Sequence, residues 1–182
     1  MRFCGIDEAG RGPLAGSLTI AGVILHKRIA GLNDSKKLSE KKRESLFETI
    51  IKNSTYHIVR FDALSIDELG LSKCLASGVR EIMSVIGEAD YLYDGNCSFG
   101  IPGLRTLVKA DITIPEVSAA SILAKVNRDR EMVQLAALYP EYGFEEHKGY
   151  GTNAHIEAIR QYGHCEIHRK SFKLKSLQPS LF

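Results

Sequence analysis

The stretch Arg2-Phe-Cys-Gly-Ile6, followed at once by Asp7-Glu-Ala-Gly-Arg-Gly-Pro13, decides how the chain folds. A short, mostly apolar run that leads into glycine and proline is typical of a strand that ends in a tight turn. The strand therefore delivers two neighbouring carboxylates, Asp7 and Glu8, to its end. Because adjacent strand residues point to opposite faces, only one of them enters a shared site directly. The other must reach that site through the turn.

Apolar runs between turn signals predict the remaining elements. The expected strands after the first are 18–25, 56–61, 90–94 and 105–109. The expected helices are 39–52, a helix that starts with the capping-box pattern at Ser65 and runs to about Ile86, 116–138 and 153–162. This order predicts a mixed α/β sheet covered by helices.

Composition places the chain among ordinary globular proteins. It has 182 residues, of which 44% are hydrophobic and 25% charged, and these values exclude a disordered or collagen-like chain. We expect one structural domain, with a core over 1–140 and a helical and loop segment with a basic tail over 141–182. The formal net charge of +2 does not by itself indicate a nucleic-acid partner.

Several other protein classes are not expected. The longest run without charge or histidine, 12–25, is shorter than the roughly 20 residues that span a bilayer. Acidic residues stand where a signal peptide needs an apolar stretch, so we expect no secretion. The four cysteines are widely scattered, which favours neither a zinc site nor a disulfide framework and fits a reduced, cytoplasmic setting.

Further carboxylates follow other predicted strands. Asp94 ends the strand that contains Tyr91-Leu-Tyr, and Asp111 follows the strand that contains Thr106-Leu-Val. Carboxylates gathered at one sheet edge repel each other unless cations neutralise them, and oxygen ligands suit Mg²⁺ or Mn²⁺. Two such ions can hold a phosphodiester and activate water. Each acid taken singly is also explained as a turn residue or a helix cap.

At these residues the chain strongly resembles type 2 ribonuclease H, the bacterial ribonuclease HII family. The matching blocks follow the family's order over most of the chain. They are Gly5-Ile-Asp-Glu-Ala-Gly-Arg-Gly-Pro-Leu-Ala-Gly16, Leu32-Asn-Asp-Ser-Lys-Lys-Leu-Ser39, Tyr93-Asp-Gly-Asn96, Lys109-Ala-Asp111, Ser118-Ala-Ala-Ser-Ile-Leu-Ala-Lys-Val126 with Arg128-Asp129, and Tyr142-Gly-Phe144 through His147-Lys-Gly-Tyr-Gly-Thr152.

The resemblance implies a ribonuclease H-like fold, a five-stranded mixed sheet flanked by helices with a C-terminal helical segment. It also implies an endoribonuclease with four metal-binding, catalytic acids. By motif these are Asp7, Glu8, Asp94 and Asp111, and Asp129 is the competitor for the last place, with a surface ion pair as its alternative role. Such enzymes cut 5′ of ribonucleotides in RNA–DNA hybrids, and at single ribonucleotides in duplex DNA. They leave a 3′-hydroxyl and a 5′-phosphate, and they serve DNA replication and ribonucleotide excision repair.

The resemblance also assigns residues to the substrate. The turn of Gly10, Arg11 and Gly12 matches the family's junction-reading turn, where glycines let backbone N–H and C=O groups approach a 2′-hydroxyl. Tyr150 matches the tyrosine that packs on the sugar beside the ribonucleotide; a surface aromatic is its alternative role. The remaining expected contacts are Lys36 and Lys37 in a loop and Ser121 and Lys125 on a helix.

Two histidines that flank this tyrosine, His147 and His155, either touch phosphate or satisfy the loop, and we expect neither to be catalytic. The last residues resemble a peptide that docks on the bacterial β sliding clamp, with Gln178, Leu181 and Phe182 as anchors. A frayed or folded-back tail is the alternative. We expect a monomer.

Two other functions are weighed beside the ribonuclease. A Mg²⁺-dependent phosphatase or phosphotransferase would use an aspartyl nucleophile on a small phosphate ester, and the Gly-Arg-Gly turn counts against it. A non-catalytic RNA–DNA hybrid binder should lack one of the acids, and none is missing. Residues 167–182 hold four basic residues and no acid, which leaves −2 for the rest. We therefore expect the tail to attract phosphate and binding to be salt-sensitive.

Overall fold

The computed structural model describes residues 2–32 and 37–172. Lys36 and the tail anchors Gln178, Leu181 and Phe182 lie outside these ranges, so the predictions for them are not tested by the fold. Within the described ranges, no helix is both long and apolar enough to cross a membrane.

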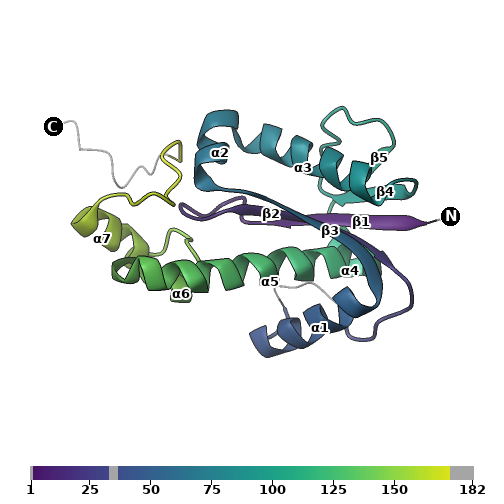
Figure 1. The fold of residues 1–182 in the computed structure, drawn as a ribbon, viewed down its shortest axis with the longest axis horizontal. Coiled ribbons are helices and arrows are strands. Elements are labelled where there is room, and N and C mark those ends of the chain that lie inside the picture. The colour runs from purple at the N-terminus through teal and green to yellow at the C-terminus, as the bar shows by residue number, and fades with distance from the viewer. Residues whose placement is uncertain (1, 33–36, 173–182) are drawn as a thin grey trace.

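A single mixed sheet forms the centre of the molecule, in the order β3-β2-β1-β4-β5 (Figure 1). Strand β1 pairs antiparallel with β2 and parallel with β4, β2 pairs antiparallel with β3, and β4 pairs parallel with β5. The five strands are β1 (Phe3–Ala9), β2 (Leu18–Leu25), β3 (Ser54–Phe61), β4 (Asp90–Asp94) and β5 (Leu104–Leu107). The predicted five-stranded mixed sheet is confirmed.

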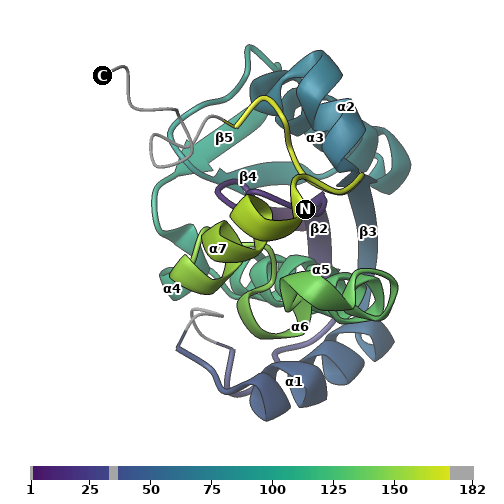
Figure 2. The ribbon, with the colours of Figure 1, turned by 90° about the vertical axis from the view of Figure 1, so that its left-hand side faces the viewer.

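Helices cover both faces of this sheet (Figures 1 and 2). Helices α2 and α3 lie on one face, and α5 lies on the other with α1 beside it, while α6 and α7 gather near the end of α5. The helices are α1 (Glu40–Lys52), α2 (Ala63–Leu69), α3 (Leu71–Ile86), α4 (Ala110–Thr113), α5 (Pro115–Leu138), the 3₁₀ turn η1 (Pro140–Tyr142), α6 (Phe144–His147) and α7 (Asn153–Tyr162).

Alternation along β1 assigns its side chains to the two layers. Cys4 and Ile6 are fully buried in the core under α2 and α3. Gly5 faces α5, and a Cβ there would lie 2.3 Å from the backbone nitrogen of Val117. The missing side chain therefore lets the first turns of α5 approach the strand that carries Asp7.

One predicted helix is wrong. The expected single helix from Ser65 is two helices, α2 and α3, which meet at Gly70 with a left-handed φ of 83°. The cap is Asp62, whose carboxylate accepts from the Ser65 N–H, so the capping-box interpretation misplaced the cap by three residues. Glycine adopts a positive φ without the steric cost that other residues meet, so it breaks the helix there.

Other boundaries shift only slightly. The first strand continues to Ala9, so Asp7 and Glu8 lie within it rather than at its end. Strand 18–25 and helix 153–162 match the prediction, and Ser39 caps α1 by accepting from the Lys42 N–H.

The C-terminal elements share an apolar cluster with the core. Leu14 and Met132 pack there with Tyr142, Phe144 and Ile159. The division at residue 140 stays a prediction.

Candidate active site

Three carboxylates from distant parts of the chain meet at one end of the sheet. Strands β1 and β4 pair in parallel, with Ile6 opposite Tyr93. The next residue of each strand is an aspartate, so Asp7 and Asp94 lie side by side. Asp111 joins them from α4, and carboxylate oxygens of the three lie within 4.8 Å of one another. Asp94 is also oriented locally, because its Oδ1 accepts from the Ala110 N–H at 3.1 Å.

Asp111 reaches this group by a different route from the one that its sequence position predicts. Strand β5 ends at Leu107, and Asp111 lies on the short helix α4 instead of directly after a strand. Lys109, just before α4, has a left-handed φ of 60°. This sharp reversal turns the chain back toward β4 and buries the Asp111 side chain.

Glu8 stands on the opposite face of β1, as the alternation of strand side chains requires. Its Oε2 accepts from the Tyr93 hydroxyl at 2.7 Å, and its Oε1 pairs with Arg11 at 3.2 Å. Within the part of the chain that the structure describes, Glu8 is not a member of the three-carboxylate group, although it lines the same cleft. The turn and its arginine therefore hold the second acid beside the group.

The clustered carboxylates at this end of the sheet favour the binding of a cation. Burial raises the pKa of Asp7 well above its usual range, and the carboxylates of Glu8 and Asp94 raise it further, against hydrogen bonds from the Glu8 N–H and the Ser121 hydroxyl. Burial also raises the pKa of Glu8, although Tyr93 and Arg11 oppose the rise. A divalent ion relieves this repulsion, and clustered carboxylate oxygens are its preferred ligands.

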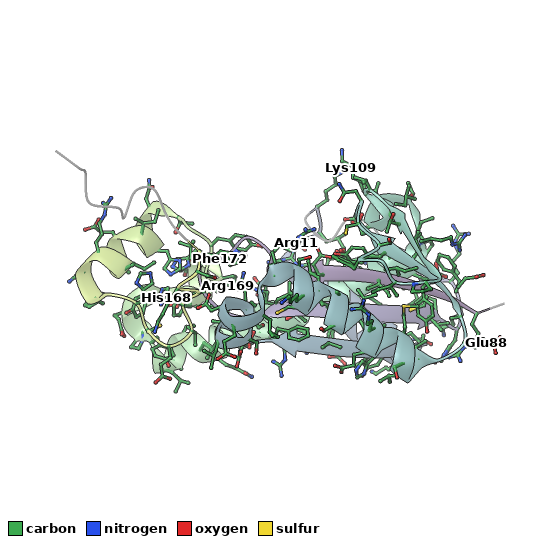
Figure 3. The ribbon with its side chains drawn as sticks, turned by 90° about the horizontal axis from the view of Figure 1, so that it is seen from above. Arg11, Glu88, Lys109, His168, Arg169 and Phe172 are labelled. Atoms are coloured by element: carbon green, nitrogen blue, oxygen red, sulfur yellow. The ribbon has the colours of Figure 1, made fainter. Side chains whose placement is uncertain are left out.

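A cleft of about 730 Å³ opens above these carboxylates. It brings together most of the residues that the sequence assigned to metal and substrate. Those residues are Asp7, Glu8, Gly10, Arg11, Gly12, Asp94, Ser121, Lys125 and Tyr150. Figure 3 shows Arg11 and Lys109 on the upper side of the molecule in that view.

The cleft also has lining residues that the sequence reasoning missed, Arg43, Val108 and Lys109 among them. Arg43 lies on the first turn of α1 and donates to the Leu38 carbonyl. The only signal was its place just after the Asp34-Ser-Lys-Lys37 loop, and a charged helix is usually interpreted as solvated. Of the predicted lysine pair, Lys37 is exposed and is not among the described lining residues.

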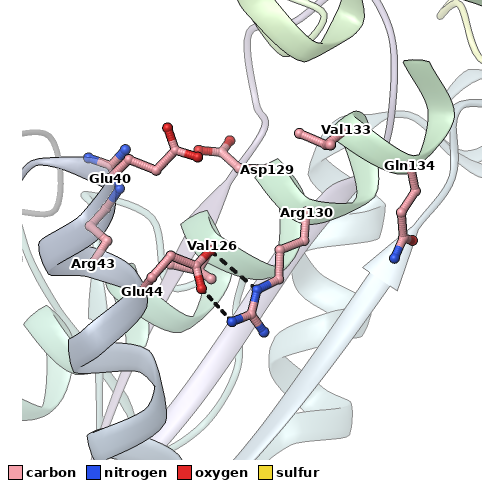
Figure 4. A pocket seen from close by; sticks show the side chains of 8 residues that line it. All are labelled: Glu40, Arg43, Glu44, Val126, Asp129, Arg130, Val133 and Gln134. Atoms are coloured by element: carbon pink, nitrogen blue, oxygen red, sulfur yellow. Dashed lines mark hydrogen bonds and ion pairs between the residues drawn. The ribbon is translucent and has the colours of Figure 1, made fainter. Parts of the chain in front are cut away.

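A second groove, of about 310 Å³, lies where α1 faces α5 and shares Arg43 with this cleft. Figure 4 shows the side chains that line it. Arg130 of α5 pairs there with Glu44 and, at 3.5 Å, with Glu48 of α1. Its guanidinium also lies 4.3 Å from the centre of the Phe47 ring. These contacts tie α1 to α5, and Arg43, which lines both the groove and the cleft, is thereby kept at the cleft wall.

The α5 residues Ser121, Lys125 and Asp129 have different roles. Ser121 is buried and donates to the Asp7 carboxylate. Lys125 lines the cleft and pairs with Asp129 at 2.7 Å. Asp129 thus makes an ion pair, as its alternative role predicts, but with Lys125 rather than with the neighbouring arginines. The three-carboxylate group contains Asp111 and not Asp129.

Tyr150 is 43% exposed at the cleft wall. Lys125 Nζ lies 5.9 Å and the Arg128 guanidinium carbon 5.7 Å from the centre of its ring. His155 is buried and contacts the Tyr150 carbonyl at 2.9 Å, and His147 contacts the Tyr142 carbonyl at 2.8 Å. His147 also accepts from the Gly149 N–H at 3.2 Å, so both histidines bond to the backbone of the loop that carries Tyr150, which is the second of the two roles considered for them.

The basic tail needs one correction. One of the four basic residues expected in the phosphate-attracting tail 167–182 is Arg169, yet it is 1% exposed and its guanidinium bonds to backbone carbonyls. Lys170 is exposed, and the remaining tail lysines lie outside the described residues.

Comparison with known proteins decides the family. The family model described as Ribonuclease HII matches residues 4–90 and 97–175. A ribonuclease HII of Sulfurovum sp. is 61% identical over 181 residues, which cover 99% of this chain and 96% of the relative. The chain belongs to the ribonuclease HII family. Ribonuclease HII proteins are metal-dependent ribonucleases, so the phosphatase alternative falls away.

Solved structures agree with this assignment. Ribonuclease HII of Archaeoglobus fulgidus, solved in a complex with PCNA, matches all of this chain and 98% of its own, with 28% identity and a TM-score of 0.83. The ribonuclease H2 of Pyrococcus horikoshii OT3 matches 95% of this chain and 94% of its own, with 28% identity and a TM-score of 0.80. The ribonuclease H-like fold expected of a ribonuclease HII is therefore confirmed.

Proposed function

We propose that the protein hydrolyses the phosphodiester on the 5′ side of ribonucleotides, both in RNA–DNA hybrids and at a single ribonucleotide within duplex DNA. The products carry a 3′-hydroxyl and a 5′-phosphate. The observation that carries the proposal is the cleft itself, with the carboxylates of Asp7, Asp94 and Asp111 beside the Gly10–Gly12 turn and Tyr150. These neighbouring residues support metal chemistry on phosphate beside a detector for one sugar hydroxyl.

The donor set fits Mg²⁺ or Mn²⁺. Three carboxylates within 4.8 Å of one another, and no histidine or thiolate in that group, are the hard ligands that both ions take. We assign Asp7, Asp94 and Asp111 as direct ligands, with Glu8 as the fourth acid and two ions in the substrate complex. When bound, such ions make water a better nucleophile and stabilise the oxygen that leaves phosphorus.

The chain's own residues orient the strand. Lys125 and Arg43 bring positive charge to a cleft whose floor is acidic, which favours a phosphate between them. Tyr150 offers an exposed ring face for the sugar beside the ribonucleotide. Ser121 holds the Asp7 carboxylate in place. Glu8 holds Arg11 at the turn, and direct binding of an ion by Glu8 requires that its contacts with Arg11 or Tyr93 open.

The test is cleavage of a DNA duplex with one ribonucleotide by Asp94→Asn. The loss of activity should exceed the roughly 10–100-fold that removal of an outer partner of a metal ligand costs. Asp90→Asn is the matched control, because it makes the same change at the other end of β4 and should leave activity intact. Cleavage by Asp94→Asn at the wild-type rate would contradict the site assignment.

We also propose that the C-terminal peptide docks on the bacterial β sliding clamp through Gln178, Leu181 and Phe182. The archaeal relative solved in complex with PCNA supports a sliding-clamp partner for this family. Deletion of the last five residues should abolish binding to the clamp while leaving cleavage of a short duplex unchanged. Equal binding by the intact and the shortened chain ends this proposal.

A further inference from the structure

Two arginines lie buried behind the Gly10–Gly12 turn. Arg128 of α5 and Arg169 of the C-terminal segment are each 1% exposed. Within the described ranges, neither makes an ion pair with a carboxylate, although a buried charge without partners is very costly. Burial, and then the neighbouring Arg128 cation, lower the pKa of Arg169 to about 10. Their donors must therefore be satisfied by other groups.

Backbone carbonyls supply those partners. Arg169 donates through Nη2 to the Gly10 carbonyl at 2.7 Å and through Nη1 to the Arg11 carbonyl at 3.3 Å. It also donates to the carbonyls of Gly16 and Ser17, both at 3.0 Å. Figure 3 shows Arg169, from the C-terminal segment, close to Arg11, which follows β1. One guanidinium thus clamps both ends of the segment 10–17.

Arg128 holds the same segment, 10–17, from the side of α5. It donates to the carbonyls of Ser17 at 2.8 Å, Ala15 at 3.0 Å and Lys148 at 3.0 Å. A Cβ at Gly10 would lie 2.4 Å from its Nε. The turn therefore rests directly on the two guanidinium groups.

This arrangement fixes which backbone groups of the turn face the cleft. A peptide unit is planar and trans, so the N–H of each residue points opposite to the C=O of the residue before it. Since Arg169 binds the carbonyls of Gly10 and Arg11, the N–H groups of Arg11 and Gly12 point away from it. These N–H groups donate to no acceptor within the described part of the chain. Arg11 and Gly12 are exposed and line the cleft.

We infer that Arg169 is a positioning residue for substrate recognition. It holds two carbonyls of the turn inward and so presents the N–H groups of Arg11 and Gly12 to the cleft as donors for a ribose hydroxyl oxygen. The inference rests on the proposed function and narrows it. The sequence predicts that both N–H and C=O groups of the turn are available, whereas the carbonyls of Gly10 and Arg11 are occupied by Arg169. The turn thus reads the sugar mainly through donors.

The residues that follow Arg169 make separate contacts that do not involve the turn. Asp67 of α2 accepts from the N–H groups of Lys170 at 2.8 Å and Ser171 at 3.0 Å. The Arg169 guanidinium also lies 5.1 Å from the centre of the Phe172 ring. Asp67 thus anchors the same segment without touching the turn, so it offers a matched control for loosening of the C-terminal segment.

The test compares Arg169→Lys with Asp67→Asn in cleavage of a duplex with one ribonucleotide, with an all-deoxy duplex of the same sequence as competitor. Lysine keeps the charge but loses the planar fork that reaches several carbonyls. We expect kcat/KM of Arg169→Lys to fall about tenfold, the size of one missing hydrogen bond to substrate. The inhibition constant of the all-deoxy duplex, which reports binding to phosphate, should stay unchanged. Asp67→Asn should change neither quantity.

Several results would overturn the inference. They are an unchanged kcat/KM in folded Arg169→Lys, an equal weakening of both duplexes, and the same selective loss in Asp67→Asn. If the wild-type protein itself fails to cut the ribonucleotide duplex, the proposed function fails first, which is a distinguishable result. Should Arg169→Lys not fold, the amide resonances of Arg11 and Gly12 in the wild-type protein decide. They should shift differently with the two duplexes, and identical shifts refute the inference.

Discussion

Alanine at Gly12 should impair the enzyme without weakening its fold. Gly12 does not have a left-handed φ, and a Cβ built on it meets no atom within 4 Å. A Gly→Ala change at such a compatible position stabilises a protein by about 0.4–1 kcal/mol, because it restricts the unfolded chain. The added methyl group points into open space at a residue that lines the cleft, where the proposed strand must pass.

Gly10 provides the contrast two residues away. Its φ is 97°, and a Cβ would lie 2.4 Å from Arg128 Nε and 2.5 Å from the Ser17 carbonyl oxygen. The left-handed backbone costs about 1–2 kcal/mol for alanine, and overpacking adds about 1–3 kcal/mol. Gly10→Ala should therefore lower the free energy of unfolding by about 2–5 kcal/mol.

Urea unfolding and steady-state cleavage of the single-ribonucleotide duplex separate the two cases. Gly12→Ala should unfold at the wild-type urea concentration or above it, yet lose at least about tenfold in kcat/KM, the effect of one blocked hydrogen bond. Wild-type kcat/KM in Gly12→Ala would refute the reasoning, because the strand would then not approach the turn. Unchanged stability of Gly10→Ala would refute the packing of the turn on Arg128.

Three further predictions concern ions, protons and salt. Mg²⁺ or Mn²⁺ at a hundred times its dissociation constant should raise the free energy of unfolding by about 2.7 kcal/mol, and calorimetry should find no such gain in Asp94→Asn. The buried pair His155 and His168, whose Nε2 atoms lie 3.0 Å apart, has for each ring a pKa of about 4 against an ordinary 6.5. Stability should thus be full above pH 6.5 and fall as the pH drops toward 4, by about 3 kcal/mol for one ring, and a flat profile in urea unfolding would contradict this. Neutralising the tail lysines should flatten the salt dependence of duplex binding by about 0.9 for each phosphate that they neutralise, and an unchanged slope would contradict a phosphate-binding tail. Those lysines are Lys170, Lys173 and Lys175.

Local pattern was sufficient for most of the fold. Strand 18–25 is a continuous apolar run, and helix 153–162 lies between clear boundary residues, so their limits match. The helix from Ser65 was wrong because its capping box competed with Asp62, three residues earlier, which caps α2 instead. The apolar periodicity continues through both Gly70 and Gly78, which are equally weak points of a helix by sequence, so the pattern does not show that the break falls at Gly70, where φ is positive.

The same distinction applies to the site, where some residues could be predicted from local sequence pattern and others could not. Asp7 and Asp94 could be paired from the sequence because parallel neighbours place their ends together. Arg43 and Arg169 could not be assigned, since a basic residue in a charged helix or tail is usually solvated. The burial of Arg169 depends on carbonyls more than 150 positions earlier in the chain, and only the folded chain brings these together.

The hydrogen bonds from Arg169 to the turn also determine the order in which parts of the site can form during synthesis. The strand that carries Asp7 and the turn after it leave the ribosome first, and domains fold as their chain emerges. The guanidinium that supports this turn comes from Arg169, 159 positions after Gly10. A partly made chain can therefore contain the acids before it contains the residue that supports the turn. Under the proposed function, selective recognition of the sugar has to wait until Arg169 has been made.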